Sequence, residues 1–251
     1  MNPTTASRTG RTGFRLLALG AVLVVLAVIA LAWLGFWDRE VLVFYPAQGV
    51  QRAQDRGLAA VIVSGDMGLK AGMGESTAHQ YAAHGIPTIG VNSLSYFRHP
   101  RSQDEVAALL ARSIRTALTR SGADRVVLIG QSYGADMVHF GLARLDPRLR
   151  GRIALVALVS PTRTLYRQVS PAEMLEFSPP DANPLVTAKL LGWARVACIR
   201  GREDSETLCP LLHLPDLRQV IMPGGHLLHR DSPGLFAAIQ GALAPSDRTI
   251  R

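Results

Sequence analysis

The sequence predicts an α/β fold in which helices cover both faces of a mostly parallel sheet, preceded by one transmembrane helix at the N-terminus. Seven short runs of apolar, often β-branched residues alternate with helical patterns, as expected for strand–helix–strand units. The longer runs are almost continuously apolar, which is typical of parallel strands buried on both faces. An apolar run without charged residues, 16–37, precedes all of them.

The composition limits the class of protein. The chain has 251 residues, of which 48% are hydrophobic and 18% charged, and this balance excludes a disordered chain. One segment, 16–37, is long enough to span a bilayer, which excludes a polytopic transporter. The net charge of +8 is scattered without basic blocks, so we expect no nucleic-acid partner. Residues 38–251 suit one large domain.

The N-terminus predicts the compartment. As a helix, residues 16–37 span roughly 33 Å, enough to cross the hydrocarbon core. The apolar core of a secretory signal is shorter, about 7–15 residues, so an uncleaved signal anchor is favoured. A cleaved signal remains the alternative, because Ala30-Leu31-Ala32 resembles a cleavage site. Trp33 and Trp37 suit the far membrane interface.

Residues 1–15 form a basic tail that we expect to stay in the cytoplasm, because positive charge before a membrane span is retained there. Its basic residues are Arg8, Arg11 and Arg15. The domain would then lie outside the cytoplasm, which in a bacterium is the periplasm, anchored in the inner membrane through residues 16–37.

The strands and helices of the domain are predicted in order along the chain. The expected strands are 41–45, 58–64, 86–91, 125–129, 153–159, 196–200 and 219–222. The expected helices are 103–120, 133–144 and 233–243, the first with an apolar face opposite arginines. A long insertion, 161–193, interrupts this alternation with Pro161, Pro171, Pro179, Pro180 and Pro184. Such an insertion is either an active-site cover or an inert surface excursion.

Gly130-Gln131-Ser132-Tyr133-Gly134 is a G-x-S-x-G motif between a predicted strand and a predicted helix. This context is the one that a nucleophilic serine on a sharp strand-to-helix turn requires. The flanking glycines let the strand and the helix approach closely. Ser132 is therefore the candidate nucleophile.

A nucleophilic serine needs a base and an acid that orients the base. In this kind of sheet they follow the serine in the order acid, then histidine. Asp204, after the sixth strand, is the candidate acid, with Glu203 and Glu206 as alternatives. His226, in a glycine-rich loop after the seventh strand, is the candidate base, with His229 as its competitor.

Backbone N–H groups must bind the oxyanion that forms when the serine attacks. One is expected from Tyr133, the residue after the nucleophile, and the other from the loop after an early strand. The loop Ser64-Gly65-Asp66-Met67-Gly68 occupies that place, so Asp66 or Met67 is the expected second donor.

Other side chains give weaker signals. Asp136 lies one helical turn after Ser132 and either faces the site or is a helix-start carboxylate. Residues 93–97 either line a pocket or pack in the core. The sequence has no phosphate-binding loop, no dinucleotide fingerprint and no H-E-x-x-H motif, so neither a cofactor nor a metal is expected.

Cys198 and Cys209 are the two cysteines of the chain, 11 positions apart, on either side of Gly201-Arg202-Glu203-Asp204. Export favours a disulfide between them over two buried thiols. Closing so short a loop would stabilise the fold by roughly 3 kcal/mol. Two cysteines at this spacing do not make a zinc site.

Over residues 40–243 the chain resembles the VirJ/AcvB bacterial virulence family, a branch of the α/β-hydrolases. The resemblance rests on SGDMG at 64–68, HGIPTIGVNSLSYF at 84–97, RVVLIGQSYGAD at 125–136, CIRGREDSETLCP at 198–210 and MPGGH at 222–226. It implies an α/β-hydrolase fold with Ser132 as nucleophile, His226 as base, the acid in the Asp204 region, and Cys198 paired with Cys209.

The resemblance also implies a function. Members of the family are associated with hydrolysis of aminoacylated phosphatidylglycerol, lysyl-phosphatidylglycerol in particular, and with type IV secretion. The expected function is therefore a periplasmic, membrane-anchored serine esterase whose substrate is a membrane phospholipid. A cationic aminoacyl head would favour carboxylates such as Asp66 or Asp136 near the pocket. The alternatives are a non-catalytic accessory factor that binds secretion-system proteins, and a general carboxylesterase or lipase.

The sequence departs from the family pattern in the loop after the second strand. The family loop reads S-G-D-G-G-W, whereas Met67 and Leu69 stand here in place of a glycine and the tryptophan. Asn92 stands where an aspartate is usual. These changes bear on the identity of the substrate more than on the type of reaction.

Overall fold

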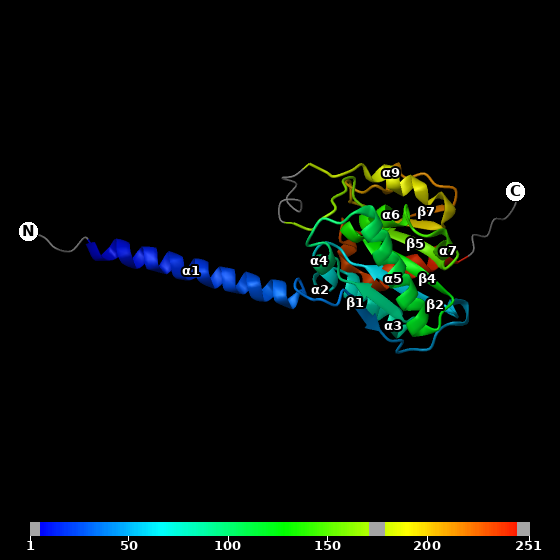
Figure 1. Ribbon diagram of the computed structural model, residues 1–251, viewed down its shortest axis with the longest axis horizontal. Helices are drawn as coiled ribbons and strands as arrows, with labels where there is room; N and C mark the ends of the chain where they lie inside the picture. Colours follow the sequence, from blue (N-terminus) through cyan, green and yellow to red (C-terminus); the bar gives the residue numbers. More distant parts are fainter. Residues whose placement is uncertain (1–5, 171–178, 245–251) are drawn as a thin grey trace, which may run out of the picture.

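A mostly parallel sheet of seven strands forms the centre of the fold in the computed structural model, which describes residues 6–170 and 179–244 (Figure 1). The strand order is β1-β3-β2-β4-β5-β6-β7, with β1 antiparallel to β3 and the other pairs parallel. The strands are β1 (Leu42–Tyr45), β2 (Leu58–Val63), β3 (Thr88–Val91), β4 (Arg125–Gln131), β5 (Ile153–Val159), β6 (Val196–Gly201) and β7 (Leu217–Met222).

Helices cover both faces of the sheet, as predicted. One apolar core packs α5 (Gln103–Ser121) and α6 (Tyr133–Leu142) on one face, and a second packs α3 (Gly74–Ala83) and α10 (Ser232–Leu243) on the other. Strand β2 shows why both faces are apolar. Val61 and Val63 point into the first core, while Ala60 and Ile62 point into the second.

All seven predicted strands are present, and the helices predicted at 103–120, 133–144 and 233–243 are α5, α6 and α10. Helix α3 was not predicted. Four short helices also lie outside the predictions: α2 (Gly68–Ala71), α4 (Ser93–Tyr96), α7 (Pro147–Arg150) and α9 (Pro184–Ala188). Helix α4 packs in the core instead of lining a pocket, since its first three residues are buried.

The N-terminal helix α1 (Ala6–Trp33) projects from the domain (Figure 1). Most of its large apolar side chains from Leu16 to Trp33 are exposed. From Arg15 to Trp33 it is long and apolar enough to cross a membrane. It ends at Trp33, whereas the predicted apolar run continues to Trp37. Residues 34–37 form turns instead, and Gly35 at φ 80° adopts the left-handed conformation that glycine tolerates.

Of the predicted insertion, 161–193, the structure describes residues 161–170 and 179–193. Isolated bridges join Thr162 to Thr207 and Leu165 to Ala182, and the segment ends in α9 and the 3₁₀ helix η2 (Lys189–Trp193). Pro171 lies outside the described residues. The part of the insertion that precedes it reaches the candidate site described below.

Candidate active site

Ser132 lies at the sharp turn between β4 and α6, with φ 51° and ψ −123°. This backbone conformation is strained for a residue with a side chain, and it persists because the surrounding packing fixes it. A Cβ on Gly130 would meet the backbone of Gly134, and a Cβ on Gly134 would meet the carbonyls of Val63 and Ser64. Both glycines are thus required by the close approach of backbone segments around the serine.

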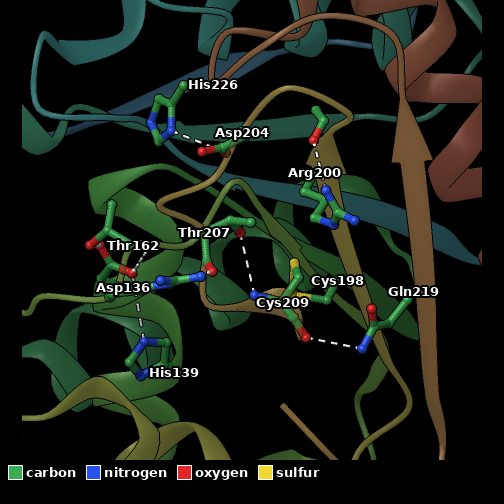
Figure 2. Close-up of a disulfide and its surroundings, with 12 residues drawn as sticks. Asp136, His139, Thr162, Cys198, Arg200, Asp204, Thr207, Cys209, Gln219 and His226 are labelled. Carbon is green, nitrogen blue, oxygen red and sulfur yellow. Dashed lines mark hydrogen bonds and ion pairs between the residues drawn. A yellow bond between two sulfur atoms is a disulfide. The ribbon is translucent and has the colours of Figure 1, made fainter. Parts of the chain in front are cut away.

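The structure places the side chains of Ser132, His226 and Asp204 next to one another, with His226 in the middle. His226 Nε2 lies 2.7 Å from Ser132 Oγ. On the other side of the ring, His226 Nδ1 lies 3.3 Å from Asp204 Oδ2, as Figure 2 shows. With the proton on Nδ1, Nε2 accepts a hydrogen bond from the Ser132 hydroxyl, and the Nδ1–H group faces the Asp204 carboxylate. The Asp204 contact has the distance of an ion pair, and Oδ2 has no hydrogen-bond partner among the described residues.

Burial distinguishes Asp204 from the other candidate acids. The Asp204 residue is 7% exposed, whereas Glu203 and Glu206 are exposed to solvent. His226, with its side chain 38% exposed, is the histidine that contacts the serine. His229, the competing base, is exposed and packs beside Gly224.

The loops that carry the acid and the histidine are joined through their backbones. Arg202 donates its N–H to the carbonyl of Met222 at 2.8 Å, and Glu203 donates to the carbonyl of Gly224 at 3.1 Å. A Cβ on Gly201 would meet the carbonyls of Gly224 and Gly225. The carboxylate and the imidazole therefore come from two loops whose separation is fixed.

The predicted disulfide is confirmed. Cys198 in β6 and Cys209, which starts the 3₁₀ helix η3 (Cys209–Leu211), are joined with their Cα atoms 5.5 Å apart (Figure 2). The bond closes the segment that carries Asp204. Both cysteines are fully buried, and Gln219 on β7 donates to the Cys209 carbonyl at 3.0 Å. The acid is thus held in a covalently closed loop.

Ser160, which follows β5, supports the histidine loop and was not singled out from the sequence. Its hydroxyl donates to the carbonyl of His226 at 2.9 Å, and its N–H donates to the carbonyl of Ile199 at 2.7 Å. Ser160 is buried and has φ 47°, which is strained for serine. A serine directly before Pro161 at a strand end was the available signal.

Two clefts meet at Ser132. The first, of about 180 Å³, is lined by Gly65, Asp66, Met67, Gly68, Met73, His226, Leu227 and Arg230, among others. The second, of about 140 Å³, is lined by Asp66, Tyr133, Asp136 and residues of the insertion, including Thr162, Thr164, Tyr166 and Gln168. The loop after β2 and the start of the insertion thus both line the space around Ser132.

All three predicted oxyanion donors lie beside the serine. Tyr133 follows it directly, and Asp66 and Met67 line the first cleft with it. Within the loop, the Met67 N–H donates to the carboxylate of Asp66 at 2.9 Å. The Met67 N–H is thus already engaged by a side chain.

Asp136 is buried on α6 and does not protrude freely into the site. Its carboxylate accepts hydrogen bonds from the N–H and the hydroxyl of Thr162, at 2.9 and 2.8 Å, and lies 3.7 Å from His139 Nε2. Burial raises the pKa of Asp136, while the nearby His139 ring and the hydrogen bonds from Thr162 oppose the shift. The same carboxylate lines the second cleft.

Within the described residues, no cluster of histidine, cysteine, aspartate and glutamate has the arrangement of a metal site. The chemistry available at the site is that of a hydroxyl, an imidazole and a carboxylate.

The fold and this line of side chains define the class of the protein as α/β-hydrolase. A 16% identical proline iminopeptidase from Mycobacterium smegmatis superposes with a TM-score of 0.51, covering 80% of this chain and 93% of that one. Est1E from Butyrivibrio proteoclasticus, solved with ferulic acid, gives 0.57 at 12% identity, with coverages of 81% and 96%. MenH from S. aureus gives 0.54 at 13% identity, with coverages of 80% and 97%.

The sequence comparison is more specific. The family described as "Bacterial virulence protein (VirJ)" matches residues 57–245, and the chain belongs to this family. The resemblance drawn from the sequence motifs is thereby confirmed. No curated protein sequence gives a significant match.

Proposed function

We propose that the chain is a periplasmic serine hydrolase, anchored in the inner membrane through residues 16–37, that cleaves an aminoacyl ester of phosphatidylglycerol, with the lysyl ester as the preferred substrate. The observation that carries the hydrolase part is the alignment of Ser132 Oγ, His226 Nε2 and Asp204 over contacts of 2.7 and 3.3 Å. The fold and the family membership support the same class of reaction.

In the proposed reaction, His226 Nε2 takes the proton of Ser132 as Oγ attacks the ester carbonyl. Asp204 keeps the imidazole in the required tautomer and stabilises its charged form. The N–H groups of Tyr133 and Asp66 bind the oxyanion of the tetrahedral intermediate. The imidazolium then protonates the leaving alcohol, and water, activated by His226, releases the acyl group from Ser132.

The second cleft supports the choice of a cationic aminoacyl group. Asp66 and Asp136 are among its lining residues, with Thr162 and Gln168 beside them. The Asp136 carboxylate is buried and bonded to Thr162, so Asp66 is the carboxylate that we propose to face the cation. An ammonium group is stabilised near carboxylates in a partly desolvated cleft. The resemblance to the family points to the lysyl ester of phosphatidylglycerol as the substrate of this kind.

The test is hydrolysis of lysyl-phosphatidylglycerol by the full chain, compared with Ser132→Ala. We expect the variant to lose roughly 10⁴–10⁶-fold in kcat, as for other enzymes that lose a triad nucleophile. Ser121→Ala is the matched control, because this serine lies at the end of α5 and lines neither cleft. Labelling of Ser132 by a fluorophosphonate probe is measured in parallel.

The outcomes separate the parts of the proposal. Labelling without turnover of the lipid would keep the hydrolase and reject this substrate. Equal turnover of an uncharged acyl ester would reject the preference for a cation. Neither turnover nor labelling in folded, oxidised protein would contradict the hydrolase and favour a non-catalytic factor that binds secretion-system proteins.

A further inference from the structure

The C-terminal end of α1 is bound by side chains of the domain. The last carbonyls of a helix have no partner within the helix and must find one elsewhere. Lys70 Nζ donates to the carbonyl of Trp33 at 2.7 Å and also lies over the Trp33 ring. Asn92 Nδ2 donates to the carbonyl of Leu34 at 3.3 Å. Two loops of the domain thus complete the end of the helix.

The residues that follow the helix are bound as well. Leu34 and Phe36 pack against the apolar core that lies under α5 and α6. Arg98 donates to the carbonyl of Phe36 at 3.2 Å, and Ser95 donates to the carbonyl of Asp38 at 2.6 Å. The segment 33–38 is therefore a docked junction and not a free linker. A freely jointed tether would show neither the buried apolar contacts nor the satisfied carbonyls.

The side chains that hold this junction come from the loops after β2 and β3. Because β2 to β7 run parallel, the ends of these strands meet at one edge of the sheet, which we call the carboxyl edge. Figure 1 shows α1 reaching the domain beside α2 and α4, which lie at this edge. Ser132, Asp204 and His226 also follow strand ends, so the site and the helix share one side of the molecule.

The segment after β2 contributes both to the active site and to the binding of the helix end. Lys70 contacts the helix end, while Asp66, Met67 and Gly68 of the same loop line the first cleft. A Cβ on Gly68, at φ 79°, would meet Asn92 Oδ1 and lie in contact with the carbonyl of Leu34. The wall of the cleft and the end of the helix therefore pack on the same few residues.

The first cleft has an apolar rim. Met67 and Leu227, both lining the cleft, are 47% and 51% exposed. The cleft volume of about 180 Å³ lies below the roughly 300–1,000 Å³ of pockets that enclose drug-sized ligands. It cannot enclose the two acyl chains of a phospholipid.

We propose that the docked end of α1 holds the carboxyl edge of the sheet against the surface of the bilayer that α1 spans, with Met67 and Leu227 in the lipid interface. The ester of a bilayer amphiphile then reaches Ser132 while its acyl chains stay in the membrane. This inference rests on the proposed anchor and the proposed hydrolase function, and it adds the orientation of the site and the partner that the apolar rim contacts.

The first test separates the anchor from the domain without altering the site. Twelve Gly/Ser residues inserted between Trp33 and Leu34 give a flexible spacer of roughly 20 Å. The same insert after Val50, which is exposed, is the control. In vesicles that contain the lipid ester, we expect the first insert to lower hydrolysis about tenfold and to leave a water-soluble ester unaffected. Unchanged hydrolysis of the lipid ester would overturn the proposal.

A depth measurement tests the orientation independently of activity. Leu227→Cys and Leu190→Cys are each labelled with a fluorophore in full chain in vesicles that contain spin-labelled lipids. Leu190 is exposed on η2, which precedes β6 and so lies at the opposite edge of the sheet. We expect quenching at position 227 only, and its loss after the insert at Trp33. Equal quenching at both positions would overturn the orientation. Quenching at position 227 only, together with an unlabelled wild-type chain that hydrolyses no ester, would keep the orientation and count against the hydrolase function.

Discussion

The conformation of Ser132 is determined by glycines that are two positions away on either side. Its φ of 51° is tolerated because Gly130 and Gly134 allow β4, α6 and the end of β2 to approach within backbone contact. The loop after β7 places His226 Nε2 at 2.7 Å from the hydroxyl. The residues that meet at the site could be predicted because each directly follows an apolar strand.

Other features of the site depend on burial, which a single sequence does not specify. Three carboxylates follow β6 within a few positions, and Asp204 differs from Glu203 and Glu206 in being buried against His226. Ser160 contacts the backbone of His226, whereas its sequence context resembles any strand end. The engagement of the Met67 N–H by Asp66 is a local hydrogen bond that no spacing rule describes.

Asp136→Asn is expected to change how stability depends on pH. Burial raises the pKa of Asp136 above 3.8, so protonation of this side chain favours the folded state. This contribution to the free energy of unfolding is fully present below the pKa of the unfolded chain, and it is lost as the pH rises through the pKa of the folded state. Asparagine has no such loss and can still accept the Thr162 N–H. The free energy of unfolding of the variant, minus that of the wild type, should therefore increase as the pH rises from below 3.8 through the native pKa.

Urea unfolding at a series of pH values measures this difference. Asp104→Asn, at an exposed carboxylate on α5, is the control and should show no comparable trend. The nearest ionisable neighbour of Asp136 is His139, so the series is repeated with His139→Gln. A difference that stays constant with pH would contradict the role assigned to burial.

At the scale of elements, the positions of the strands along the chain could be predicted from the sequence, whereas the way in which they pair in the sheet could not. The buried strands are apolar runs bounded by glycine or polar residues, which is a strong pattern. The antiparallel direction of β1 depends on its partner β3, and nothing in the segment 41–45 specifies it. Helix α3 was missed because its sequence, GESTAHQYAA, is short and mostly polar or small, and the helix packs through Thr77, Ala78, Tyr81 and Ala82.

Two helical glycines should respond in opposite ways to alanine. In α6, a Cβ on Gly134 would overlap the backbone of β2, so Gly134→Ala should destabilise the fold by about 1–3 kcal/mol. In α10, a Cβ on Gly241 meets nothing within 4 Å, so Gly241→Ala should stabilise by roughly 0.5–1 kcal/mol. Thermal and urea unfolding of the two variants gives both values. Stabilisation by Gly134→Ala would contradict the close backbone contact between α6 and the end of β2.

For the whole molecule, the disulfide joins β6 to η3 and so closes the loop that bears Asp204. Replacing both cysteines, Cys198→Ser with Cys209→Ser, should lower the free energy of unfolding by roughly 2–4 kcal/mol. The double replacement should also slow fluorophosphonate labelling of Ser132, because Asp204 is then held less firmly beside His226. Wild type treated with a reductant should match the double variant, and the double variant should not respond to the reductant. Equal urea midpoints would contradict this account.

The docked junction at 33–38 has a consequence for kinetics. An enzyme fixed to the surface that holds its substrate samples molecules by lateral diffusion, so its rate would follow the mole fraction of substrate among the surrounding lipids and not the amount per volume of solution. Because Lys70 and Asn92 fix the helix end to the domain, a site anchored through α1 as proposed would not turn away from the lipid leaflet beneath it. The reaction would therefore be confined to one leaflet, and continuous turnover would make the two leaflets chemically different.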